Sequence, residues 1–317
     1  MDDRSVSQGI TPPQRRWRRM IAPIAVAAVL IAWGMFLAGQ FDSLRSYAWQ
    51  IAPAALLASV ALSALYYGGL ALCWSLLLRS MAAQPVAHPA AVRIWLLSMI
   101  SRYIPGNVWH ILSRALMADR LGVSRTTVVA SASIEQLLTL LAAFGIAALT
   151  LPVWQLRNTL ASDLPFGEIL IAAVAIGLLG LHPRMLGAAL AWAGRRFGRR
   201  DLLWSYRYRD ILRIVAVSVA AQLGSGLALA AVIAGISGIA PADLLPIIGA
   251  AALAWALGYL SFLTPSGLGV REGVLTALLL LVVPLPVATI ASLLYRVALT
   301  LGELLAVLLA WFLRRSG

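Results

Sequence analysis

The chain has 317 residues, of which 61% are hydrophobic and 12% are charged. Soluble domains carry about 25% charged residues, so this composition excludes an ordinary soluble enzyme and indicates a polytopic membrane protein. The formal net charge is +13 and every basic residue is an arginine. Because the arginines stand in loops between apolar runs, we interpret this charge as a topology signal and predict no nucleic-acid binding.

The apolar residues form long runs separated by polar segments. Residues 1–19 are polar and end in RRWRR, and the run 20–39 follows. A run of about 20 residues is long enough to cross a bilayer as a helix, and it exceeds the apolar core of a signal peptide. The later runs are 51–78, 126–151, 169–181, 211–236, 244–263, 274–283 and 287–313. Residues 88–124 are predicted to be irregular.

These runs predict an all-α membrane helix bundle with about seven or eight transmembrane helices and two broken or re-entrant segments. We expect one transmembrane domain at 20–314 between a cytoplasmic tail at 1–19 and a cytoplasmic end at 315–317. With both termini inside a bacterial-type plasma (inner) membrane, only Arg45 and Arg157 fall in outer loops. The run 274–283 is too short for an ordinary span, so it either crosses or forms a half-helix.

Two stretches interrupt the apolar pattern in the same way. They are SRYIPGNVWHILSR (101–114) and LSFLTPSGLGVREG (260–273), and each places a proline and a nearby glycine before an arginine. Proline removes a backbone donor, and lipid tolerates a broken helix only where protein or water covers it. Paired broken segments therefore indicate a binding site; ordinary turns at the membrane surface are the alternative. The predicted topology opens both stretches toward the cytoplasm.

Charged residues inside or next to the apolar runs are the candidates for that site. Glu135 lies in the run 126–151, and Arg271-Glu272 opens the short run. Arg296 and Glu303 are seven residues apart in the last run, so they share one helix face. A charge at mid-membrane costs roughly 2.5–3.5 kcal/mol on insertion scales, so such residues face protein or water and have partners.

We expect these residues to line one polar cavity in which arginines hold an anionic head group, because the planar guanidinium binds two phosphate oxygens at once. The glutamates would balance the arginines when the cavity is empty. The alternative is a set of buried ion pairs that only fix helix packing. The candidate lipid-binding residues are Arg102, Tyr103, Pro105, Gly106, Arg114, Glu135, Pro265, Ser266, Gly267, Gly269, Arg271, Glu272, Arg296 and Glu303.

The sequence predicts no metal site, no cofactor and no catalytic residues. The three histidines do not cluster with carboxylates or thiols at ligand spacing, and Cys73 is the single cysteine. His110 beside Trp109 is interpreted as an interfacial aromatic pair. We find neither a nucleophile with its base nor a nucleotide-binding loop, so we expect the chain not to be an enzyme.

Four motifs resemble, in this order, the lysylphosphatidylglycerol synthase transmembrane-region family. They are SRYIPGNVW…SRA, IEQLLTLLA, TPSGLGVREG and LLYR, and the resemblance extends from the first apolar run to the last. It implies a flippase-like integral membrane module without the soluble aminoacyl-transferase domain that follows in the best-known members. One departure is that the family often shows Glu-Arg where this chain has Glu135-Gln136.

Three functions follow from these patterns. The first is a lipid translocator that binds or moves an anionic or modified head group, with anionic phospholipid or polyprenyl-linked lipid as its partner. The second is a non-catalytic accessory or scaffold subunit of a lipid or glycolipid pathway, acting as a homo-oligomer or beside a biosynthetic enzyme. The third, which has the least support, is an integral membrane lipid-linked transferase, because that chemistry usually needs clustered acids.

Overall fold

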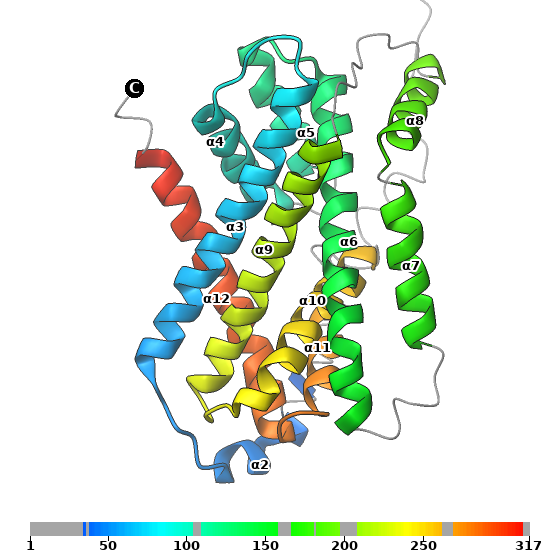
Figure 1. Cartoon of the computed structure of the whole chain (residues 1–317). Helices are drawn as coiled ribbons and strands as arrows, with labels where there is room; N and C mark the ends of the chain where they lie inside the picture. The colour runs from blue at the N-terminus through cyan, green and yellow to red at the C-terminus, as the bar shows by residue number, and fades with distance from the viewer. Residues whose placement is uncertain are drawn as a thin grey trace, which may run out of the picture.

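The part of the chain that the structure describes is a bundle of helices (Figure 1). The structure is a computed structural model that describes residues 34–35, 38–103, 109–157, 166–180, 182–196, 208–261 and 269–312. The α-helices are α2 (Phe41–Ser46), α3 (Pro53–Met81), α4 (His88–Met99), α5 (Trp109–Ala118), α6 (Arg125–Arg157), α7 (Phe166–Gly180), α8 (Pro183–Arg196), α9 (Tyr208–Ala234), α10 (Leu244–Leu260), α11 (Val270–Leu279) and α12 (Leu285–Phe312). Short 3-10 turns are η1 (Ile100–Tyr103), η2 (Asp119–Leu121) and η4 (Pro241–Asp243).

Five helical segments are long and apolar enough to cross a membrane. They are Pro53–Met81, Arg125–Trp154, Tyr208–Ala234, Pro241–Leu260 and Leu285–Phe312. An α-helix satisfies its own backbone groups, which is what lipid requires of a spanning segment. With no strand in the described ranges, these spans confirm the predicted all-α polytopic bundle. The predicted run 20–39 lies almost wholly outside the described residues.

Helices α3 and α9 pack antiparallel along the centre of the bundle, and α12 packs on both. The backbone N–H groups of Gln50 and Ala52, just before α3, donate to the carbonyls of Ile236 and Gly235, just after α9, at 3.0 and 2.9 Å. The start of α3 and the end of α9 therefore lie at the same end of the bundle. The other end, where α3 stops and α6 and α9 begin, is called the arginine-rich end; it carries Arg79, Arg120, Arg125 and Arg213.

Helices α4 and α5 form a first hairpin that dips into the bundle from the arginine-rich end. The ring of His88, at the start of α4, lies 2.8 Å from Ser75 near the end of α3. Arg102, just past α4, lies over the ring of Tyr67 at mid-α3, so α4 runs back along the second half of α3. With 12 residues, α4 rises about 18 Å, which is too short to cross. The region predicted to be irregular is thus largely helical.

Helices α10 and α11 form a second hairpin that dips in from the opposite end. The hydroxyl of Thr276 on α11 donates to Ser292 at 2.9 Å, and Arg271 lies over the ring of Tyr295. Helix α11 therefore runs antiparallel to the first half of α12, and its 10 residues rise only about 15 Å. The short run near 274–283 is accordingly a half-helix rather than a crossing segment.

The two hairpins enter the bundle from opposite ends, and Figure 1 shows α4 and α5 in one half of the bundle and α10 and α11 in the other. The broken stretches were expected to open toward the same face, the cytoplasm, and this stays a prediction. The residues between the helices of each hairpin, 104–108 and 262–268, lie outside the described residues.

The crossing of α3 and α12 depends on a glycine. A Cβ at Gly302 would lie 2.7 Å from the backbone nitrogen of Ala64 and 2.8 Å from the carbonyl carbon of Ser63. We expect Gly302→Ala to destabilise the protein by about 1–3 kcal/mol, the usual effect of overpacking, as measured by unfolding in mixed micelles. Gly68→Ala on α3 is the control, because a Cβ at that position would have nothing within 4 Å. Equal effects at both sites would contradict this close packing.

The orientation of the bundle in the membrane can be tested by labelling single cysteines. Arg120 and Ala240 are exposed at opposite ends of the bundle, and the native Cys73 is buried. We expect an impermeant maleimide to label Ala240→Cys from the outer face, and Arg120→Cys only after permeabilisation, because positively charged loops stay inside. Labelling of both from one face would disprove the antiparallel arrangement, and the reverse pattern would invert the predicted orientation.

Candidate functional site

A cavity of about 80 Å³ lies where the inner ends of the two hairpins meet. Its polar lining comes from η1, α5, α6 and α11, and consists of Arg102, His110, Gln136 and Arg271. Its aromatic lining comes from α3, α4 and α10, and consists of Tyr66, Tyr67, Trp95, Trp255 and Tyr259. Segments far apart in the sequence therefore enclose one polar space beside the middle of α3.

Arg102 holds the inner end of the first hairpin against α12. Its guanidinium forms an ion pair with Glu303 and donates to the hydroxyl of Tyr67 at 3.4 Å. It also lies 5.7 Å from the centre of the Tyr67 ring. The Arg102 side chain remains 23% exposed and that of Glu303 4%, so the arginine still faces the cavity while its charge is balanced.

Arg271 reaches the same cavity from the second hairpin. Its guanidinium lies 5.3 Å from the centre of the Tyr295 ring, and the Tyr295 hydroxyl donates to the carbonyl of Ser225 on α9 at 3.0 Å. The Nη2 atom of Arg271 is buried without a hydrogen-bond partner. Among the described residues no carboxylate forms an ion pair with Arg271. The side chain is therefore fixed by aromatic contact, with donor capacity left over.

Arg296 and Glu272 join the second hairpin to α12. The Nη1 atom of Arg296 lies 3.3 Å from Oε1 of Glu272, close enough for an ion pair but not aligned as a hydrogen bond. The other oxygen, Oε2, accepts the backbone N–H of Gly269 at 2.7 Å. Gly269 has a φ of +85°, which only glycine adopts without strain. Glu272 thus satisfies an N–H group at the start of α11 that has no partner within the helix.

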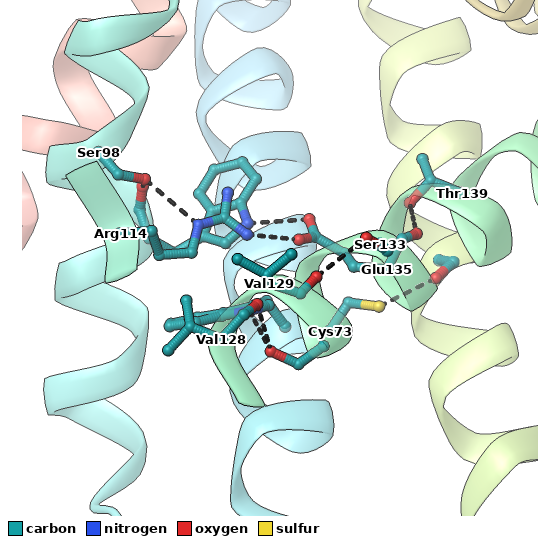
Figure 2. Close-up of polar contacts among 12 residues, drawn as sticks. Cys73, Ser98, Arg114, Val128, Val129, Ser133, Glu135 and Thr139 are labelled. Carbon is teal, nitrogen blue, oxygen red and sulfur yellow. Dashed lines mark hydrogen bonds and ion pairs between the residues drawn. The ribbon is translucent and has the colours of Figure 1, made fainter. Parts of the chain in front are cut away.

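Arg114 and Glu135 form a pair that is fully buried between α5 and α6 (Figure 2). The Nη1 atom of Arg114 lies 2.7 Å from Oε2 of Glu135, and both side chains are 0% exposed. The indole of Trp95 donates to Oε1 at 2.8 Å. The guanidinium lies 4.9 Å from the ring of Trp74 and 5.3 Å from that of Trp95. The pair joins the first hairpin to α3 and α6.

The charged members of the predicted site take part in four separate sets of contacts, those of Arg102, Arg271, the Arg296–Glu272 pair and the Arg114–Glu135 pair. Arg296 and Glu303 share a face of α12 but pair with different hairpins. Arg114, which was expected near the head group, belongs to the buried pair and does not line the cavity. Tyr103 ends η1. Pro105, Gly106, Pro265, Ser266 and Gly267 lie outside the described residues, so their predicted role stays a prediction.

Several residues that line the cavity were missed by sequence reasoning. His110 was assigned to the membrane interface, but it is 7% exposed and faces the cavity. The signal that could have found the others is aromatic and polar residues in the middle of apolar runs, as with the Tyr66-Tyr67 pair and Gln136. Among the described residues, no three His, Cys, Asp or Glu side chains converge as a metal site would require.

The fold and the cavity define a class: a multi-pass membrane protein whose polar centre lies where two helical hairpins from opposite ends of the bundle meet. The family described as the lysylphosphatidylglycerol synthase TM region matches residues 20–311. The chain belongs to this family, which confirms the resemblance of its motifs. A comparison with curated proteins finds no match.

The contribution of the buried Arg114–Glu135 pair to stability can be tested by substitution. Removing one partner of a buried pair leaves an uncompensated charge, so we expect Glu135→Ala to destabilise the protein by about 3–5 kcal/mol. The double variant Arg114→Met with Glu135→Leu should recover part of this loss, because it leaves no charge. Unfolding in mixed micelles measures both. Asp119→Asn, which breaks the exposed pair with Arg125, is the control and should change little. A double variant no more stable than Glu135→Ala would contradict the argument.

Proposed function

We propose that the chain is an inner-membrane lipid translocator that binds an anionic or modified head group in the cavity between the two hairpins. The single observation that carries this proposal is the presence of Arg102 and Arg271, from hairpins of opposite direction, in one cavity beside the middle of α3. Broken helices that meet at mid-membrane are typical of substrate sites in transporters. Membership of a family named after a lipid-modifying synthase is consistent with a lipid partner.

The lining suits the polar part of a lipid. Arginine binds two oxygens of a phosphate through its planar fork, and the two cavity arginines differ in how far their charge is already balanced. The aromatic walls offer apolar faces and polar edges, which match the junction between a head group and its glycerol. A volume of about 80 Å³ suits a head-group fragment, so the acyl chains would lie outside the cavity.

The opposed hairpins provide a route for movement between leaflets. Each hairpin is attached at one end of the bundle and contributes residues near its inner end to the cavity lining. Displacing the first hairpin would open the cavity toward the arginine-rich end, and displacing the second would open it toward the other end. Access would then alternate around a fixed site, as in transporters built from discontinuous helices. We propose no catalytic role.

A second candidate is an accessory or scaffold subunit in which the charges only hold helices together. It is favoured by the ion pairs themselves, since Arg102–Glu303 and Arg296–Glu272 each join a hairpin to α12. The two candidates differ in what Arg271 does. A scaffold needs it only for packing against Tyr295, whereas a translocator needs its free donors for the head group.

Lipid exchange in liposomes tests the proposal. Head-group-labelled phosphatidylglycerol and a polyprenyl phosphate are reconstituted with the protein, and an impermeant quencher reports label in the outer leaflet. Hydrogen bonds to charged groups contribute roughly 1.5–3 kcal/mol, so Arg271→Ala should slow exchange of the transported lipid about tenfold or more. Arg120→Ala, at an exposed arginine outside the cavity, is the matched control and should exchange at the parent rate.

Folding is measured in parallel to separate the candidates. Slow exchange by a variant that unfolds like the parent supports a translocator. Loss of folding in Arg271→Ala with no exchange by the parent supports a scaffold. No acceleration of any lipid by the folded parent, relative to empty liposomes, rejects translocation.

A further inference from the structure

We infer that the cavity selects lipids whose head group carries one net negative charge. This inference rests on the proposed head-group function and adds the charge class of the cargo. It comes from the charges that lie in the membrane around the cavity, called here the central charges: Arg102, Arg114, Glu135, Arg271, Glu272, Arg296 and Glu303. The central charges are four arginines and three glutamates, so their formal charges sum to +1.

The structure shows which charge is left over. Each central glutamate already has an arginine: Glu303 has Arg102, Glu135 has Arg114 at 2.7 Å, and Glu272 has Arg296 at 3.3 Å. Arg271 is the remaining cation, with no ion pair to a carboxylate anywhere in the described ranges. The other acidic residues that the structure describes lie in short 3-10 turns or in the first turns of helices: Asp42, Asp119, Glu168, Asp210 and Asp243.

Arg271 is also placed to receive an anion. It lines the cavity, it is held over the Tyr295 ring, and its Nη2 atom is buried without a partner in the described part of the chain. The remaining polar lining adds no formal charge, since Gln136 is an amide and His110 is counted as neutral at pH 7. Arg93 on α4 neither lines the cavity nor pairs with a described central charge.

The head group expected to bind best is the one whose charge brings the sum of the central charges to zero. An uncompensated charge inside a membrane protein is unfavourable, so a phosphodiester with a single negative charge completes the set. A phosphomonoester carries about −1.5 to −2 charges at pH 7 and leaves an excess of negative charge. A zwitterionic head group leaves Arg271 unbalanced, and a cationic one adds to the surplus.

A competition among lipids of equal acyl chains tests this. The purified full chain, in a nonionic detergent, is mixed with equal amounts of dioleoyl phosphatidylglycerol, phosphatidylethanolamine, phosphatidic acid and a dioleoyl trimethylammonium lipid. Native mass spectrometry then reports which lipid stays bound, since the four differ in mass. We expect phosphatidylglycerol to be retained about tenfold over each of the others, the difference that one charge-assisted hydrogen bond supplies.

Two variants change the net charge around the cavity in opposite directions. Gln136→Arg adds a positive charge to the cavity lining and should shift the preference toward phosphatidic acid. Arg271→Gln removes one and should shift it toward phosphatidylethanolamine. Arg271→Lys keeps the charge without the planar fork, so it should keep the order of preference. Arg120→Gln, outside the cavity, controls for lipid held by the arginine-rich surface and should leave the order unchanged.

The outcomes separate this inference from the function on which it rests. Retention of phosphatidylglycerol with opposite shifts in the two charge variants supports it. If the parent retains another lipid more strongly than phosphatidylglycerol, the inferred charge preference is wrong, although the head-group site is still supported. The same conclusion follows if neither Gln136→Arg nor Arg271→Gln changes the order of preference among the four lipids. No retention of any of the four lipids by the folded parent rejects the head-group site, and the inference with it.

Discussion

The buried pair between Arg114 and Glu135 is the interaction on which the centre of the bundle depends. Two charges in a membrane interior are tolerated only when they are paired and their remaining polar atoms find partners. Here Trp95 donates to the carboxylate, and the rings of Trp74 and Trp95 lie beside the guanidinium. These contacts come from α3, α4, α5 and α6, so one pair positions the first hairpin relative to the two long helices beside it (Figure 2).

The same requirement explains why α12 carries two charges of opposite sign. A half-helix ends inside the membrane, where its unpaired groups must be satisfied by the protein. Arg296 of α12 pairs with Glu272, which in turn accepts the N–H of Gly269 at the start of α11. Glu303, two turns further on, pairs with Arg102 of the first hairpin. Helix α12 therefore holds the inner ends of both hairpins, and a movement of either hairpin must act on an ion pair to α12.

Sequence patterns predicted the long helices well because their signal is local. A run of about 20 apolar residues has few alternatives to a membrane helix, and α3, α9 and α12 follow the predicted runs closely. The charged residues were also found, since a charge in such a run is conspicuous. Their pairing was not, because the shared face of Arg296 and Glu303 does not reveal which hairpin lies against it. Whether the short run 274–283 crosses or returns was left open for a related reason: a 10-residue helix crosses or returns according to its packing on α12, which is a long-range property.

Position 136 shows how the cavity lining can change while the ion pairs that hold the helices together remain. The resemblance to the family implies an arginine after the glutamate in many members, whereas this chain has Gln136 next to Glu135. The carboxylate of Glu135 is directed to Arg114 and Trp95, while the side chain of Gln136 lines the cavity. An arginine at 136 would therefore change the charge of the cavity lining and leave the buried pair intact. The buried pair and the cavity charge depend on neighbouring residues that face different partners, so a substitution at 136 changes the charge of the cavity without removing a contact that holds the helices together.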